Sequence, residues 1–251
     1  MRAVIVIALA AISAGCATGA TPTASRDRAA AQMIARAYGV DRFDRVASVH
    51  FIFHAQRGEQ ETVREWRWDP HARRVTYRGL GPDGTPLTHA YRRKRLWAGH
   101  RTLNEQLDRW FVNDEYWLFF PFHLAWDEQA VIEADGAKDL PIPPGRAQHL
   151  TITYPKTGGY TPGDAYELFY DPDGLILQWV YRKGNQPTPT LIATWEEHTR
   201  IGPMTVSLRH RSVDNAVRVW FTDVAVRLAG RKGWIRPASS KPGSAGDLIV
   251  R

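Results

Sequence analysis

The sequence predicts a mainly β protein with a few helices. Short segments in which apolar and polar residues alternate recur along most of the chain, as in residues 47–55 and 61–69. Turn sequences separate them, including Gly-Pro-Asp-Gly at 81–84 and Asp-Pro-Asp-Gly at 171–174. Apolar residues at helical spacing occur near the start and in the middle of the chain. We therefore expect an antiparallel sheet of about eleven strands with an N-terminal helix and a central helical cover.

The first fifteen residues have the pattern of a signal peptide. Arg2 precedes an apolar run at residues 3–12, and small residues then lead to Cys16. The apolar run is shorter than the roughly 20 residues that a membrane-spanning helix needs. Export to the bacterial envelope is the expected consequence.

Cys16 is the only cysteine, so the chain cannot form an intramolecular disulfide. Its position after Ala14 and Gly15 resembles the lipobox of bacterial lipoproteins. That resemblance implies a lipidated Cys16, attachment to a membrane through the N-terminus and, with Ala17 next, the periplasmic side of the outer membrane. Ser13 stands where the family usually has leucine. Ordinary cleavage, for example after Ala17, is the alternative and implies a soluble periplasmic protein.

The remaining sequence is long enough for one large β domain, since such domains run to about 250 residues. Residues 16–24 are small and polar and predict a tether after the lipidated cysteine. A single domain is expected over residues 25–233, followed by a flexible tail at 234–251 that is rich in Ser, Gly and Pro.

The net charge of +7 does not predict a nucleic-acid partner. The basic residues are scattered, and the densest cluster is the short run at 92–95. Nucleic-acid-binding proteins carry a basic stripe or a recognisable motif, which this chain lacks. A weak attraction to anionic lipid head groups is the simpler use of the charge.

Two regions of the chain have helical patterns, and the rest is predicted as strands. Ser25 can cap a helix that runs to about Tyr38. Leu103, Leu107 and Trp110 share one face of a second helix, and Asn113-Asp114 marks a break or a new cap after it. The run at 116–122 is apolar on every side, so it is expected to be buried or to cover an apolar surface. Strands are expected at 47–55, 61–69, around Val75 and Tyr77, and at 87–95, 129–134, 147–154, 164–171, 175–183, 190–197, 204–212 and 216–227.

This order of elements, with the segments Trp110–Phe122 and 163–174, resembles the LolA/LolB-like family of lipoprotein carriers and related outer-membrane lipoprotein-sorting proteins over about residues 25–227. The resemblance implies a strongly curved antiparallel sheet, an unclosed half-barrel whose concave face is covered by helices. It also implies a space that holds acyl chains, so the expected partners are a lipid, an acyl chain or a lipoprotein.

Alternation along the strands and the apolar middle segment select the aromatic residues that would line this space. A solid core would need the same residues, because large aromatics on an inner face cannot be left in water. The candidate apolar lining consists of Phe51, Phe53, Trp66, Trp68, Trp110, Trp117, Phe120, Phe122, Trp179, Tyr181 and Trp195.

No motif in the chain predicts catalysis, a metal or a cofactor. His50 and His54 share a strand face but lie about 13 Å apart, too far to bind one metal ion. The adjacent carboxylates of Asp127 and Glu128 would point to opposite faces of a strand. A Gly-x-Ser-x-Gly nucleophile elbow is absent from the sequence. We therefore predict a non-enzymatic protein.

The ten tryptophans suggest a second hypothesis, an exported carbohydrate-binding protein or hydrolase with surface Trp and Tyr residues. The pattern disfavours it, because Trp117 lies in the apolar run and Trp66 alternates with charged neighbours. Both are expected to face inward. The leading hypothesis is an envelope lipoprotein that binds an apolar ligand in the concavity of its sheet.

Overall fold

A computed structural model describes residues 22–93, 102–157 and 161–238 of the chain. The predicted signal peptide, Cys16 and the end of the chain from residue 239 lie outside the described residues. In the described part, none of the helices has both the length and the apolar character that crossing a bilayer would require.

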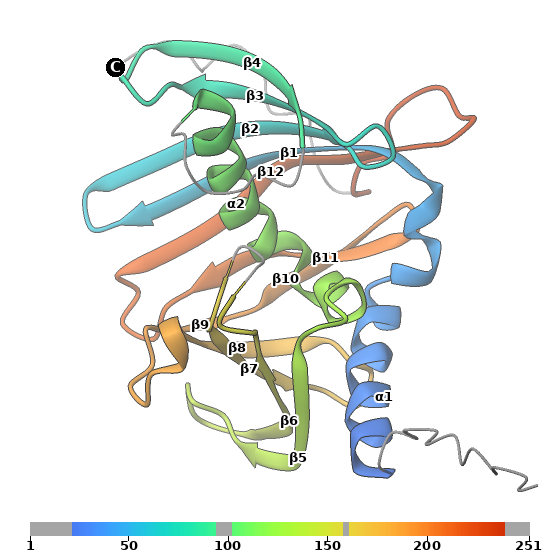
Figure 1. Cartoon of the computed structure of the whole chain (residues 1–251), viewed down its shortest axis with the longest axis vertical. Coiled ribbons are helices and arrows are strands. Elements are labelled where there is room, and N and C mark those ends of the chain that lie inside the picture. Colours follow the sequence, from blue (N-terminus) through green and yellow to red (C-terminus); the bar gives the residue numbers. More distant parts are fainter. Residues whose placement is uncertain (1–21, 94–101, 158–160, 239–251) are drawn as a thin grey trace, which may run out of the picture.

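Twelve strands form two antiparallel sheets, and neither sheet closes on itself. One antiparallel bridge, between Ala193 and Ser212, joins the two sheets. The prediction of a mainly β, antiparallel and unclosed fold is confirmed, with the curved surface divided between two sheets (Figure 1). The seven-stranded sheet has the order β10 (Glu196–Ile201), β11 (Met204–Arg211), β12 (Val217–Leu228), β1 (Val46–Arg57), β2 (Gln60–Asp69), β3 (Arg74–Leu80) and β4 (Pro86–Arg92). The five-stranded sheet has the order β5 (Val131–Asp139), β6 (Arg146–Thr153), β7 (Ala165–Tyr170), β8 (Ile176–Arg182) and β9 (Leu191–Thr194).

The additional strand arises because the predicted strand at 190–197 is two strands. β9 pairs with β8, whereas β10 pairs with β11, so the chain passes from one sheet to the other between them. Trp195 lies at this crossing, where its backbone N–H donates to the carbonyl of Leu177 at 2.8 Å. The indole of Trp195 is buried against His210, with ring centroids 4.7 Å apart.

Strand β1 lies near the middle of the larger sheet and shows the alternation predicted from the sequence. Val49, Phe51 and Phe53 are buried on the inner face, while His50 and His54 are only half-buried on the other. In the register with β2, Phe51 lies opposite Trp66. Inward-facing aromatic pairs from neighbouring strands thus build the core on this side of the molecule.

Helix α1 (Pro22–Ala37) runs beside the smaller sheet (Figure 1) and begins inside the segment predicted as a tether. Ile34 and the following Tyr38 are completely buried. The hydroxyl of Tyr38 accepts a hydrogen bond from the backbone N–H of Ile176 in β8 at 3.0 Å, and it lies 2.8 Å from Nε2 of His198 in β10. Tyr38, the residue after α1, therefore contacts one strand of each sheet through its hydroxyl group. Short 3₁₀ turns cover Val40–Arg45 and Lys183–Asn185.

Helix α2 (Leu103–Trp126) crosses between the two sheets (Figure 1). It begins with a capping box, in which Thr102 and Glu105 each satisfy a backbone N–H of the other. The break or cap expected at Asn113-Asp114 was wrong, because the helix continues through both residues. Asp114 does not cap a helix here: its carboxylate accepts hydrogen bonds from Trp66 and Arg64 on β2. The expected burial of residues 116–122 is confirmed.

Beyond residue 233, the predicted end of the domain, the chain still packs against the larger sheet. The backbone of Ile235 exchanges two hydrogen bonds with that of Val226, at 2.7 and 2.9 Å. The ring of Trp234 lies under the guanidinium of Arg67, 5.6 Å from its centroid.

Candidate functional site: a cleft between the sheets and helix α2

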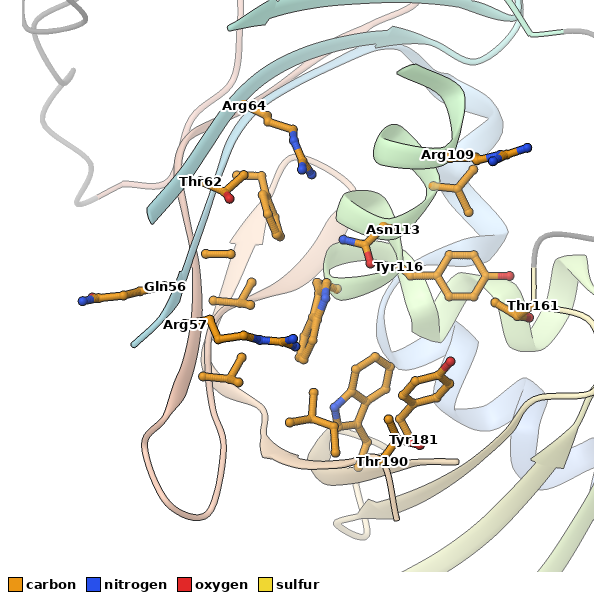
Figure 2. Close-up of a pocket in the computed structure, with 18 of the residues that line it drawn as sticks. Gln56, Arg57, Thr62, Arg64, Arg109, Asn113, Tyr116, Thr161, Tyr181 and Thr190 are labelled. Carbon is orange, nitrogen blue, oxygen red and sulfur yellow. The ribbon is translucent and has the colours of Figure 1, made fainter. Parts of the chain in front are cut away.

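A cleft of about 680 Å³ lies between the inner face of the larger sheet, the middle of α2 and one end of the smaller sheet. Its volume falls in the range of roughly 300–1,000 Å³ that is typical of small-molecule sites. Residues of β1, β2 and β12 form one wall, α2 forms another, and β8 with the segment leading to β9 forms the third (Figure 2).

The inner part of the cleft is apolar. Phe53 and Val219 come from the larger sheet, Trp117 from α2, and Trp179 from β8. The rings of Trp117 and Trp179 are in contact, with centroids 4.6 Å apart. These side chains belong to the hydrophobic core, and at most 9% of each is exposed.

Polar residues, including three arginines, also line the cleft. Figure 2 shows the side chain of Arg57 entering the cleft from the end of β1, while Gln56 points the opposite way. Arg64 and Asn113 face the same space from β2 and α2. Arg64 is paired with Asp114, but neither Arg57 nor Arg109 makes an ion pair within the described part of the chain.

Two buried ion pairs fix α2 against the larger sheet. The first joins Nη1 of Arg64 to Oδ1 of Asp114 at 2.7 Å, and the indole N–H of Trp66 donates to the other oxygen of Asp114 at 2.8 Å. Burial raises the pKa of Asp114 to about 6, although the Arg64 guanidinium opposes this change. The second pair joins Arg93 to Asp108 at 2.9 Å. Because both carboxylates are completely buried, removing either arginine would leave a buried carboxylate without its ion-pair partner.

The last turns of α2 are held by His123, which lies between two carboxylates. Its Nε2 is 3.1 Å from Glu115, its Nδ1 is 3.1 Å from Asp127, and Asp127 also accepts a hydrogen bond from Tyr154 of the β6–β7 connection. Burial alone would lower the pKa of His123, but the charge of Glu115 and the hydrogen bonds to both carboxylates raise it to about 9. The imidazolium is therefore the stable form at neutral pH, and it connects α2 to the smaller sheet.

This raised pKa predicts that stability falls as the pH rises from 7 to 9. In the unfolded chain His123 has a pKa near 6.5, so its contribution is complete below that pH and is lost through pH 9. We expect a loss of about 2 kcal/mol in the free energy of unfolding across this interval. Urea unfolding at a series of pH values measures it, and His123→Gln should flatten the profile. An unchanged profile in the variant would contradict the assignment to His123.

The structure divides the aromatic residues predicted as an apolar lining into two groups. Phe53, Trp117, Trp179 and Tyr181 line the cleft. The others are packed elsewhere in the core: Phe51, Trp66, Trp68, Phe120, Phe122 and Trp195 are buried, and Trp110 is half-buried against Tyr77 and Arg64. Among the nine tryptophans in the described residues, five are buried and four are half-buried, and carbohydrate binding stays a hypothesis.

Sequence reasoning did not identify the polar and small residues of the cleft. Arg57 ends β1, Thr62 and Val217 lie near or at the starts of β2 and β12, and Asn113 lies one turn before Trp117 on α2. The alternation that selected Phe51 and Phe53 also places Arg57 on the inner face, two residues beyond Ala55. Continuing the alternation to the end of the strand would therefore have identified Arg57 from the sequence.

The described side chains contain no group of three or more His, Cys, Asp or Glu residues arranged to hold a metal ion. The absence of an enzymatic activity stays a prediction.

No known protein family matches the chain, and neither does any curated protein sequence. Solved structures with a similar fold include the following two. One is a DUF1329 family protein from Desulfovibrio piger, with 12% identity and a TM-score of 0.42 over 79% of this chain and 92% of that one. The other is a protein domain named for outer membrane lipoprotein sorting, from Vibrio parahaemolyticus, with 10% identity and a TM-score of 0.46 over 82% of this chain and 94% of that one. At these identities and TM-scores, both likenesses concern the backbone alone.

Proposed function

We propose that this protein binds an acyl chain, either of a lipid or of an acylated protein, in the cleft between α2 and the sheets. The observation that carries the proposal is the cleft itself, whose inner lining includes the largely buried aromatic residues Phe53, Trp117 and Trp179. Each methylene group that leaves water for such a lining contributes about 0.8 kcal/mol. The N-terminal pattern supports a setting in the bacterial envelope, with attachment to the outer membrane through Cys16.

The amphipathic character of the cleft supports the same ligand class. Small-molecule sites combine an apolar lining with a few polar groups that orient the ligand. Here apolar side chains lie beside arginines and amides in one lining, which suits a ligand with a long apolar chain and a polar end. A role in lipid or lipoprotein trafficking is the corresponding proposal for the cell.

The test is to fill the cleft without removing any core contact. Ala55 lines the cleft and is half-buried, so Ala55→Trp places a large ring where the ligand would lie. We expect the purified, delipidated protein to bind a fluorescent fatty-acid analogue and Ala55→Trp to weaken that binding by a factor of ten or more, since the ring excludes several methylenes.

Ala90→Trp, on the exposed side of β4, is the matched control and should leave binding unchanged. Phe120 is unsuitable for this purpose, because it is completely buried and a charge there would test folding. The proposal fails if the delipidated protein binds no fatty-acid analogue, or if Ala55→Trp binds it as tightly as the unmodified chain does.

A further inference from the structure

We infer that the ligand of the cleft carries an anionic head group and that Arg57 binds it. This inference depends on the proposed function, since it names the chemical class of the acyl ligand and the residue that selects it. It is carried by the order of side chains along the sheet wall and by the balance of charge around the cleft.

The sheet wall becomes more polar toward its outer end. Phe53, Ala55 and Arg57 alternate along β1 and share its inner face. Across β12, Phe221 lies opposite Phe53, Val219 opposite Ala55, and Val217 opposite Arg57. A chain lying along β1 and β12 therefore contacts apolar side chains until it reaches Arg57, where its head group would be.

On β2 the residues opposite this wall are polar along its whole length, and Arg64 lies opposite Phe53. Thr62 lies opposite Ala55 and Gln60 lies opposite Arg57, and both line the cleft. Gln60 is exposed and Thr62 is half-buried, so their polar groups can remain hydrated beside a head group. The β2 residues beside Arg57 are therefore polar and uncharged, while Arg64 at the other end of the wall is neutralised by Asp114.

The other charged groups that line the cleft do not neutralise Arg57. Arg64 is neutralised by Asp114 at 2.7 Å. The one carboxylate in the lining, Asp164, already accepts hydrogen bonds from the Tyr181 hydroxyl at 2.9 Å and from the backbone N–H of Gly184 at 2.7 Å. Within the described residues, Arg57 has no carboxylate partner, and its side chain enters the cleft (Figure 2).

Arg109 also lines the cleft without an ion pair among the described side chains, but Figure 2 shows it directed away from Arg57. It adds to the positive potential, while Arg57 is positioned to contact the head group. A guanidinium donates two parallel hydrogen bonds to a carboxylate or a phosphate, and such charge-assisted bonds are stronger than neutral ones. Arg57 therefore selects anionic over neutral amphiphiles.

The experiment compares ligands that share a sixteen-carbon chain and differ in the head group. Palmitate, hexadecyl phosphate, hexadecanol and hexadecyltrimethylammonium each displace a bound fluorescent fatty-acid analogue from the delipidated full-length mature protein at low salt, below their micelle concentrations. We expect at least one anion to bind about tenfold more tightly than hexadecanol, and the cation to bind most weakly. Palmitate and hexadecyl phosphate distinguish a fatty acid from a phosphate-bearing lipid as the source of the head group.

Arg57→Gln should weaken binding of the preferred anion about tenfold and leave hexadecanol binding unchanged, while Arg57→Lys should retain part of the preference. Arg218→Gln is the matched control. Arg218 is adjacent on β12, donates to Gln56 at 2.6 Å, and does not line the cleft, so the same loss of charge there should have little effect.

The outcomes separate the inference from the function on which it depends. If all four ligands bind equally, or if Arg218→Gln weakens anion binding as much as Arg57→Gln does, the inference is overturned and acyl binding stands. If none of the four ligands displaces the probe, or the probe does not bind, the proposed function itself fails. A preference for either anion that disappears in Arg57→Gln supports the inference and names the head group.

Discussion

Replacing Arg64 by leucine is expected to lower the free energy of unfolding by about 3–5 kcal/mol. The guanidinium lies 2.7 Å from Asp114, whose side chain is completely buried, and Arg64 itself is only 17% exposed. Without Arg64 the carboxylate of Asp114 is left buried with only the neutral hydrogen bonds of Trp66 and Asn113. Urea unfolding followed by circular dichroism measures the change in free energy, with the m-value as a check that the unfolding transition is unaltered.

Two further variants give this prediction its control. Arg78→Leu removes an arginine from the same sheet whose pair with Glu65 is 3.5 Å long and half-exposed, so it should cost less than about 1 kcal/mol. Adding Asp114→Asn to Arg64→Leu should restore part of the loss, because the remaining amide carries no charge. Equal effects of Arg64→Leu and Arg78→Leu would show that the buried pair does not anchor α2.

Phe120→Ala is expected to destabilise the protein by about 3–5 kcal/mol. Phe120 is completely buried in α2, and its ring lies 4.7 Å from that of Tyr166 and 5.4 Å from that of Trp179. Truncation leaves a cavity between the helix and the smaller sheet, and the rigid rings around it cannot collapse to fill the space. Thermal and urea unfolding would both report the loss.

Leu80→Ala is the appropriate comparison, because Leu80 is 60% exposed at the end of β3. Its truncation should change the free energy of unfolding by no more than about 0.5 kcal/mol. A small effect of Phe120→Ala would mean that α2 can shift toward the smaller sheet. In that case the helix would be a movable cover of the core.

Alternation and turn chemistry were enough to predict most strands, because both are local properties. Val49, Phe51 and Phe53 point to one side of β1 for the reason that successive residues of any strand point to opposite sides. The prediction missed the division of residues 190–197, since the change of partner at Trp195 depends on which strands lie nearby. Nothing in the neighbouring sequence identifies those partners.

The prediction for α2 was wrong for the opposite reason, because tertiary contacts overrode a local sequence signal for a helix end. Asn113 and Asp114 favour helix ends because their side chains compete for backbone hydrogen bonds. In the folded protein Arg64 and Trp66 bind the carboxylate of Asp114, so that competition disappears and α2 continues. Tertiary contacts with β2 thus decided the length of the helix.

The sequence by itself determined that this protein is mainly β, that its aromatic residues face inward, and that residues 116–122 are buried. Each of these follows from periodicity or from the cost of exposing apolar surface. Only the tertiary structure decided which aromatics reach the cleft, and that Arg64 is neutralised while Arg57 is not. The reason is physical: alternation sets the direction of a side chain, whereas its accessibility and the neutralisation of its charge depend on residues that the fold brings from far along the chain.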